Sequence, residues 1–234
     1  MNENQFDFDS GYVRETLGSY TARTFFWMFL GLLTTFGVAW YGARSGLVWR
    51  MLYSVPMLQI VLLAAQLIVV LVLSARVHKI QVGTAYALFF AYSILTGVTF
   101  STIFLAYDLG AALLAFGMTA LYFGGMALYG HFTKADLSRI RPILTGGLIC
   151  LLLFGLLSLF LPMGAFERLM CLAGIGIFMG FTAYDTQKIK AFYNYYSGYP
   201  EMLEKASILS ALELYLDFIN LFLYLLRVFA RNRD

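Results

Sequence analysis

Seven long apolar stretches, separated by short polar joints, constrain this chain more than any other feature. A helix needs about 20 mostly apolar residues to cross the hydrocarbon core of a bilayer. The composition agrees, because 61% of the 234 residues are hydrophobic and only 12% are charged, whereas about 25% are charged in a soluble domain. We therefore predict an all-α integral membrane protein. The predicted spans are residues 25–43, 55–74, 82–106, 109–130, 143–162, 169–187 and 206–229.

The joints between the spans are too short to hold a separate soluble domain. Neighbouring helices must then pack antiparallel in one bundle. We expect a cytoplasmic N-terminal segment over residues 1–24, a single transmembrane domain over 25–230 and a short tail over 231–234. The N-terminus carries acids and has no small-residue cleavage site, so we expect the first span to insert and stay.

The distribution of Lys and Arg predicts the orientation. The N-terminal segment and every second joint hold ten of these residues, whereas the other joints hold only Arg44, Arg50 and Arg168. Since cytoplasmic loops carry the excess of positive charge, we predict a cytoplasmic N-terminus. Arg227, together with two arginines in the tail, would then lie outside if the last segment crosses fully. A re-entrant last segment would return them to the cytoplasm, and we favour the full crossing because the segment is long enough.

Glycines in two spans predict close helix packing. Gly176 and Gly180 form a small-xxx-small pair in the sixth span, and Gly117, Gly124 and Gly125 lie in the fourth. Such residues let helix backbones approach each other in a membrane. We interpret all five as packing positions.

Cysteine and histidine give no sign of a metal or redox centre. Cys150 and Cys171 lie inside apolar runs without the spacing of a redox or metal motif. His78 and His131 lie in polar joints, and no His-x-x-x-His spacing occurs. The net charge of +3 comes from residues that flank spans. We therefore expect no resident metal or cofactor, and no nucleic-acid partner.

The last apolar stretch contains carboxylates where a spanning helix rarely has them. Residues 213–227 read ELYLDFINLFLYLLR, and an ionised acid at the bilayer centre costs roughly 2.5 kcal/mol or more. Glu213, Asp217 and Asn220 recur at i, i+4 and i+7, so they share one helix face. Asp185 follows the charge-free part of the sixth span, and a short joint makes the last two helices neighbours. We therefore predict that Asp185 and Asp217 lie on neighbouring helices in the cytoplasmic half.

Four strings in the spans and joints have a distinctive sequence. They are LSARVHKI at 73–80, TGVTFSTIF at 96–104, AYDTQKIK at 183–190 and ALELYLDFINLFLYLLR at 211–227. With them the chain resembles the Bax inhibitor-1 family of membrane proteins (transmembrane Bax inhibitor motif proteins) across essentially all seven spans. The resemblance implies a seven-transmembrane-helix bundle with a central C-terminal helix. It also implies a bacterial inner membrane protein and a pH-sensitive calcium leak.

The resemblance further implies roles for named residues. Asp185 and Asp217 match the paired aspartates of the family, and Arg76 matches a basic residue of the second span that pairs with them. Two carboxylates in a low-dielectric site cannot both ionise cheaply, so they would share a proton and sense pH. Protonation would release Arg76 and let the second span move as a gate. The resemblance gives Glu213 no role. Because Glu213 and Asn220 share a helix face with Asp217, they are candidate contributors to a path for Ca²⁺, which prefers oxygen ligands.

Structural alternatives stay open for these residues. Asp185 could pair with Lys188 at i+3 on a solvated helix end. Asp217 could be a protonated acid beside Asn220 that only fixes helix packing. Arg76 could be a flanking charge that orients the second span.

Two functional alternatives also stay open. Tyr184-Asp185 and the later Asp217 imitate the two aspartates of intramembrane aspartyl proteases, and a shared proton suits hydrolysis. The glycines that should precede the second aspartate are missing, so we expect no enzymatic activity. The other alternative is a non-transporting membrane regulator that binds a membrane protease or a stress-pathway partner.

Overall fold

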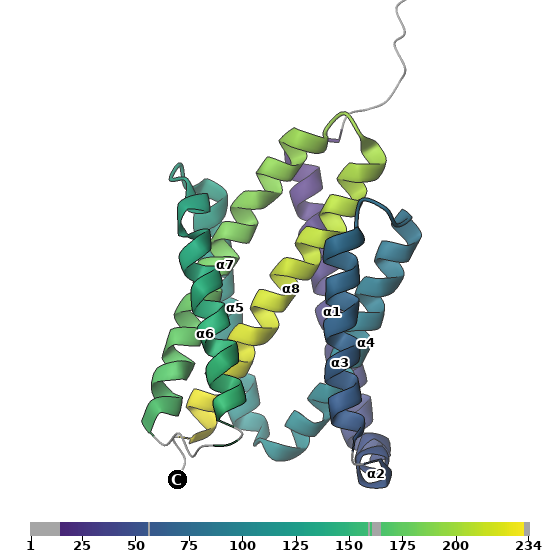
Figure 1. Cartoon of the computed structure of the whole chain (residues 1–234), viewed down its shortest axis with the longest axis vertical. Helices are drawn as coiled ribbons and strands as arrows, with labels where there is room; N and C mark the ends of the chain where they lie inside the picture. Colours follow the sequence, from purple (N-terminus) through teal and green to yellow (C-terminus); the bar gives the residue numbers. More distant parts are fainter. Residues whose placement is uncertain (1–14, 56, 159, 161–164, 232–234) are drawn as a thin grey trace, which may run out of the picture.

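The computed structural model describes residues 15–55, 57–158, 160 and 165–231. Within them, seven helices are long and apolar enough to cross a membrane (Figure 1). The predicted all-α bundle of seven spans is thereby confirmed. The elements are α1 (Leu17–Ser45), α2 (Leu47–Ser54), α3 (Leu58–Arg76), α4 (Val82–Ala106), α5 (Leu109–Phe132), the 3-10 helix η1 (Leu137–Ile140), α6 (Arg141–Leu157), α7 (Ala165–Tyr196) and α8 (Pro200–Arg231).

Several helices extend beyond the predicted spans. α1 begins at Leu17 and not at residue 25, α7 continues to Tyr196, and α8 already begins at Pro200. Hydropathy identifies only the apolar turns, and the polar turns at the bundle end remain helical. Residues 17–24 therefore belong to the bundle and not to a separate segment. The parts of the predictions that concern residues 1–14, 56, 159, 161–164 and 232–234 lie outside the described residues.

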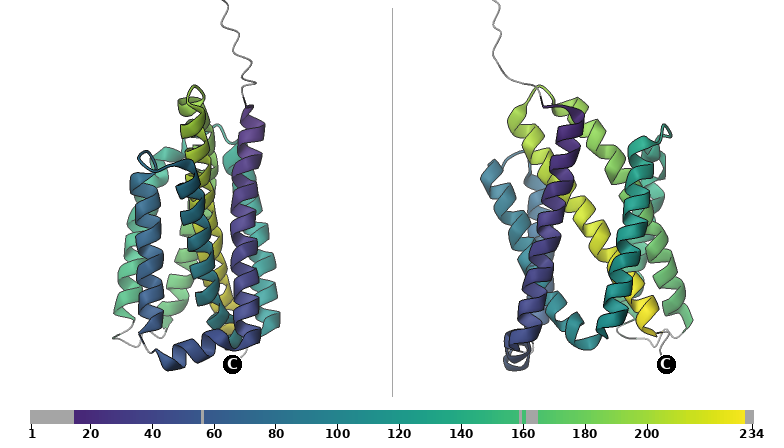
Figure 2. Two further views of the ribbon diagram at one scale, coloured as in Figure 1. Left: turned by 90° about the vertical axis from the view of Figure 1, so that its right-hand side faces the viewer. Right: turned by 180° about the vertical axis from the view of Figure 1, so that it is seen from behind.

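Local sequence signals set several helix ends. Thr16 precedes α1 and its hydroxyl accepts from the Ser19 backbone N–H at 3.2 Å, and Asp108 accepts from the Gly110 N–H at 3.0 Å at the start of α5. Gly46 has φ = 67°, a left-handed conformation that glycine adopts without strain. It ends α1, and the short α2 then lies across that end of the bundle (Figure 2).

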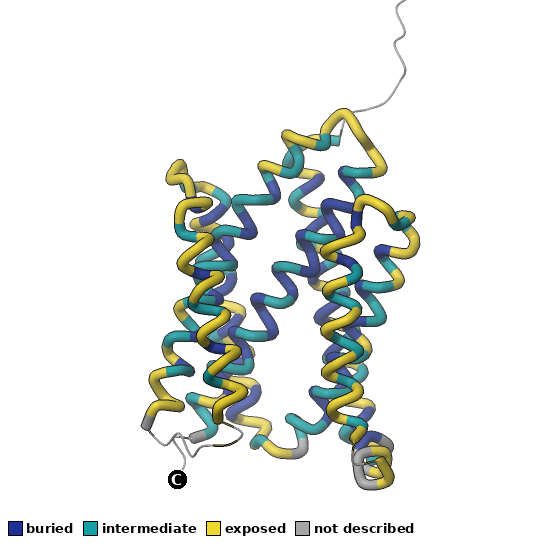
Figure 3. Tube along the Cα trace, in the orientation of Figure 1, coloured by how far each residue is buried: buried dark blue, intermediate teal, exposed yellow. Residues whose placement is uncertain are grey.

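α8 is the central helix. It packs against α1, α4, α5 and α7, and it is buried along most of its length (Figure 3). In its most apolar 18-residue stretch, 67% of the residues are buried. The helix at the end of the chain is therefore the core around which the others are arranged.

Hydrogen bonds and aromatic rings hold this core together. The Thr35 hydroxyl of α1 donates to the Ser93 backbone oxygen of α4 at 2.9 Å. Thr35 has then used its proton, so the Tyr215 hydroxyl of α8 donates to Thr35 Oγ1 at 2.6 Å. The Tyr215 ring also packs edge-on against Phe89 and Tyr92. Three helices are thus tied together by one buried side chain.

The last segment crosses the bundle completely. α8 is a single helix from Pro200 to Arg231, and it ends at the opposite end of the bundle from the start of α1 (Figures 1 and 2). The structure therefore has the predicted full crossing and not the re-entrant alternative.

The packing glycines are only partly as predicted. A Cβ on Gly180 would lie 2.6 Å from a Leu144 methyl group of α6, so this position is a packing contact as predicted, although the end of the leucine side chain can shift. Gly130, which the sequence did not single out, lies directly against the Ala183 backbone of α7. The prediction is wrong for the other positions, where a Cβ in place of the glycine hydrogen would have no described neighbouring atom within 4 Å; these are Gly117, Gly124, Gly125 and Gly176.

Candidate functional site

Asp185 and Asp217 lie together inside the bundle, on α7 and α8. Their exposed fractions are 7% and 4%, and their carboxyl groups are within hydrogen-bonding reach of each other. The two helices are joined by a short turn after Tyr196 and pack against each other. The structure therefore brings together the two residues that the spacing of the last spans predicted to be close.

A second charged pair lies one helical turn nearer the α7–α8 turn. Lys188 Nζ lies 2.6 Å from Glu213 Oε1, and both side chains are largely buried. Lys188 follows Asp185 at i+3, and Glu213 precedes Asp217 at i−4, so each helix presents both of its charges on one face. The site therefore has two layers, an acid pair and an ion pair.

The charges in this site do not balance. Three carboxyl groups face one lysine, and Arg141 of α6 also acts electrostatically on Asp185. Asp217 Oδ2 and Glu213 Oε2 are buried without a hydrogen-bond partner among the described residues. Because two adjacent carboxylates repel each other in a low dielectric, the arrangement favours one proton shared between the aspartates.

Arg76 and Asn220 are not part of this contact network. Arg76 is exposed at the end of α3, and none of the ion pairs in the described part of the chain includes it. α3 packs against α4, whereas α7 packs against α5, α6 and α8. The predicted ion pair between Arg76 and the aspartates is therefore not formed in this structure, in which Lys188 is the nearby α7 cation. Asn220 donates to the Leu216 backbone oxygen of its own helix at 2.8 Å.

This geometry differs from the structural alternatives for Asp185 and Asp217. Asp185 is not on a solvated helix end, and the ion-pair partner of Lys188 is Glu213. The amide of Asn220 binds its own helix, so it does not hold Asp217. Sequence reasoning missed the bond between Lys188 and Glu213. A signal was available, since a buried Glu213 needs a cation and the preceding span ends in two lysines.

The described residues contain no group of three or more His, Cys, Asp or Glu side chains arranged to hold a metal ion. The acid pair and the ion pair beside it form a buried cluster of charged side chains inside the helix bundle. Fold and site together define a class: a multi-pass α-helical membrane protein whose central last helix carries a buried acid pair.

Comparison with known proteins agrees with this class. The family model described as "Inhibitor of apoptosis-promoting Bax1" matches residues 17–234. The chain is 43% identical over 221 residues to the inner membrane protein YbhL of Escherichia coli strain K12, which covers 94% of both chains. It is 39% identical over 218 residues to an uncharacterized protein of Deinococcus radiodurans, which covers 92% of this chain and 91% of the relative. The chain belongs to the Bax inhibitor-1 family, and the predicted resemblance is confirmed.

Proposed function

We propose that this protein is a pH-sensitive calcium leak channel, gated by Asp185 and Asp217. The observation that carries the proposal is the contact between these two buried carboxyl groups across the α7–α8 interface. A structural ion pair would need an acid and a base, whereas this contact joins two acids. Such a pair responds to pH because its stability depends on the proton it holds.

The helices that carry the two acids supply the gating element. With a shared proton, the carboxyl groups hold α7 and α8 together. With both groups ionised, they repel each other across the same contact. A change of pH therefore changes the force between the central helix and its neighbour, and α8 transmits this to α1, α4 and α5. In this proposal Lys188 takes the place that the family resemblance assigned to Arg76.

The chemistry of the site suits Ca²⁺ as the permeant ion. Calcium prefers carboxylate and carbonyl oxygen ligands. Glu213 and Asp217 each hold a buried carboxylate oxygen that no described donor occupies. The proposal assigns the acids to gating and ion attraction and not to hydrolysis, because the residues before Asp217 are Leu214, Tyr215 and Leu216.

We also propose a bacterial inner membrane location with a cytoplasmic N-terminus. The relative from Escherichia coli is named an inner membrane protein. The start of α1 and the joints after α3, α5 and α7 lie at the same end of the bundle, and this end carries the excess of Lys and Arg. Such an excess marks the cytoplasmic side. A reporter fused before α1 should be active in the cytoplasm, and activity only outside would contradict this orientation.

The experiment that tests the channel is Ca²⁺ efflux from liposomes that contain only the purified protein, measured across pH. We expect efflux above that of empty liposomes, with a rate that depends on pH. The double variant Asp185→Asn with Asp217→Asn should lose the pH dependence and still insert, since Asn is nearly isosteric with Asp. Absence of efflux at every pH would contradict the channel and favour the non-transporting regulator.

A further inference from the structure

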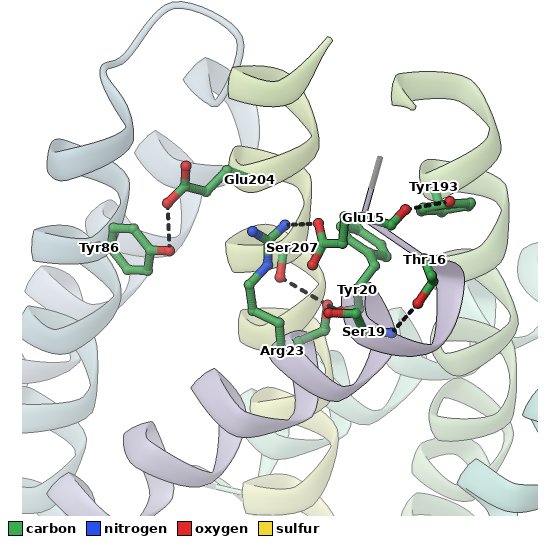
Figure 4. Close-up of polar contacts among 10 residues, drawn as sticks. Glu15, Thr16, Ser19, Tyr20, Arg23, Tyr86, Tyr193, Glu204 and Ser207 are labelled. Atoms are coloured by element: carbon green, nitrogen blue, oxygen red, sulfur yellow. Dashed lines mark hydrogen bonds and ion pairs between the residues drawn. The ribbon is translucent and has the colours of Figure 1, made fainter. Parts of the chain in front are cut away.

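A second polar cluster lies where the start of α1 meets α7 and α8 (Figure 4). Arg23 Nη2 lies 2.9 Å from Glu15 Oε2. The Tyr193 hydroxyl of α7 donates to the Glu15 backbone oxygen at 2.6 Å, so α7 is fixed to the backbone two residues before α1. The Arg23 side chain is 31% exposed. This ion pair therefore lies at the partly exposed end of the interface between the three helices, which we call its mouth.

Tyr20 lies directly behind this ion pair. It is fully buried, its ring centroid is 5.6 Å from the Arg23 guanidinium carbon, and its hydroxyl has no described hydrogen-bond partner. Glu213 is close enough to act electrostatically on that hydroxyl. Tyr20 thus lies between the Arg23–Glu15 ion pair and the ion pair of Lys188 with Glu213.

A hydrogen bond fixes the depth of α1 relative to α8 at this level. Thr24 donates to the Tyr20 backbone oxygen at 3.0 Å. The Ser207 hydroxyl of α8 therefore donates to Thr24 Oγ1, at 2.9 Å. Thr24 of α1 and Ser207 of α8 therefore lie at the same depth in the bundle, and residues that follow them on the two helices lie deeper.

Unpartnered polar atoms continue inward along α8. Ser210 Oγ, Glu213 Oε2 and Asp217 Oδ2 are all buried without a described hydrogen-bond partner. Their spacing of three and four residues places them one turn apart, and the ten residues from Ser207 to Asp217 span about 15 Å. With the Tyr20 hydroxyl, they form one row from the mouth to the acid pair.

Such a row is unusual in a packed interior. Nearly all buried polar side-chain atoms have a hydrogen-bond partner, and each atom without one is costly. Isolated exceptions occur, but these four follow one another along a single helix interface. One water molecule joins two to four polar groups, so a file of water along this interface would satisfy all four atoms.

We propose that the seam between α1, α7 and α8 is a hydrated route for small cations from the N-terminal side of the membrane to the acid pair, closed at its mouth by Arg23. The inference rests on the proposed channel function and names the route and closing residue of the same site. Ser210 lies on this route, and Glu213 lies at its inner end beside Lys188.

The charges at the mouth give the seam its closing element. The Arg23 guanidinium repels an approaching cation, and the Glu15 carboxylate offsets that charge at 2.9 Å. Removing Arg23 should open the route to cations, and removing Glu15 should close it further. These opposite effects separate a charge effect from a folding defect, which would lower transport in both variants.

Thiol accessibility tests the route without any measurement of transport. The full chain is prepared with Cys150→Ser, Cys171→Ser and Ser210→Cys in sealed vesicles of known orientation. A positively charged, membrane-impermeant methanethiosulfonate is added from either side. Phe26→Cys in the same background is the matched control, because Phe26 is 54% exposed on the outer surface of the bundle and follows Thr24 at a similar depth.

We expect Ser210→Cys to react from the N-terminal side on the order of tenfold faster than Phe26→Cys, since the reactive thiolate forms only where water reaches. Adding Arg23→Gln should speed this reaction on the order of threefold by removing the repelling charge. Equal rates for the two cysteines, or reaction of Ser210→Cys only from the opposite side, would overturn the proposal.

Calcium efflux from the charge variants completes the test. Arg23→Gln should raise efflux, and Glu15→Gln should lower it; a decrease in both would overturn Arg23 as the closing charge. The two measurements separate the two proposals. If Ser210→Cys reacts from the N-terminal side but no liposome shows efflux, the channel is wrong and the hydrated seam stands. If efflux occurs and Ser210→Cys is unreactive, the seam is wrong and the channel stands.

Discussion

α3 and α8 are both long and apolar enough to span a membrane, but they differ in how much of each helix is buried. α3 is the more apolar of the two, and only 6% of its most apolar stretch is buried, against 67% for α8. α8 carries Glu213 and Asp217, whereas α3 carries no charge before Arg76. In a soluble protein the most apolar helix would lie in the core. Here it faces lipid, and the polar helix lies in the centre.

The difference follows from the solvent. Lipid tails are as apolar as leucine, so burial of apolar side chains does not drive one span against another. Close packing and hydrogen bonds do so instead. Tyr215 illustrates this, since its ring packs against two aromatic residues and its hydroxyl binds Thr35. On α3, Leu67 is 61% exposed and its surroundings are lipid.

The largest expected effect concerns this packing contrast. Tyr215→Ala should lower the free energy of unfolding by about 3 kcal/mol or more, because it leaves a cavity and breaks the contact with Thr35. Leu67→Ala should change it by less than about 0.5 kcal/mol. Unfolding by SDS in mixed micelles measures both. Similar losses in the two variants would contradict the central position of α8.

A smaller effect is expected from charge. Lys188→Met removes the partner of Glu213 and leaves a largely buried carboxylate, so the free energy of unfolding should fall by about 2 kcal/mol. Arg76→Met is the control on α3 and should change it by less than about 0.5 kcal/mol. Adding Glu213→Gln to Lys188→Met should restore much of the loss. A double variant as unstable as the single one would argue against the ion pair.

The smallest expected effects concern two glycines of α5. Gly130→Ala forces a methyl group against the Ala183 backbone of α7 and should cost about 1 kcal/mol. Gly117→Ala projects into open space and should be neutral or stabilising by up to about 1 kcal/mol, because alanine favours the helix. The same unfolding measurement applies. If both substitutions lowered the free energy of unfolding, or both raised it, the result would contradict the distinction between the packed and the open face of α5.

The sequence predicted the number and order of the spans well, because hydropathy reports directly on transfer into lipid. It also predicted that Asp185 and Asp217 would be neighbours, because a short joint leaves consecutive helices few other arrangements. The sequence did not predict the rotation of each helix about its own axis. That rotation is set by packing, and it decides that Gly130 rather than Gly117 meets another backbone.

The same limit explains why Arg76 was matched to the aspartates although the structure has no ion pair between them. A basic residue at the end of a span can be assigned to an acid only if the helices face each other, and α3 packs against α4 instead. The sequence indicates Lys188 only as a partner within α7, since an i+3 spacing is visible in it. Its bond to Glu213 crosses between helices. Tyr20 and Ser210 carried no signal, because Tyr20 lies in the segment that was predicted to precede the transmembrane domain and a serine in an apolar stretch is common.

The most direct test of the central claim is the pH profile of Ca²⁺ efflux for Asp217→Asn in liposomes. If Asp185 and Asp217 share a proton, the substitution removes the repulsion between them, so the midpoint of the profile should move or disappear while the protein still inserts. Asn220→Ala is the control one turn away and should keep the wild-type midpoint. Glu213→Gln should change the rate more than the midpoint. An Asp217→Asn profile that coincides with wild type, together with a shifted Glu213→Gln profile, would contradict gating by the aspartate pair.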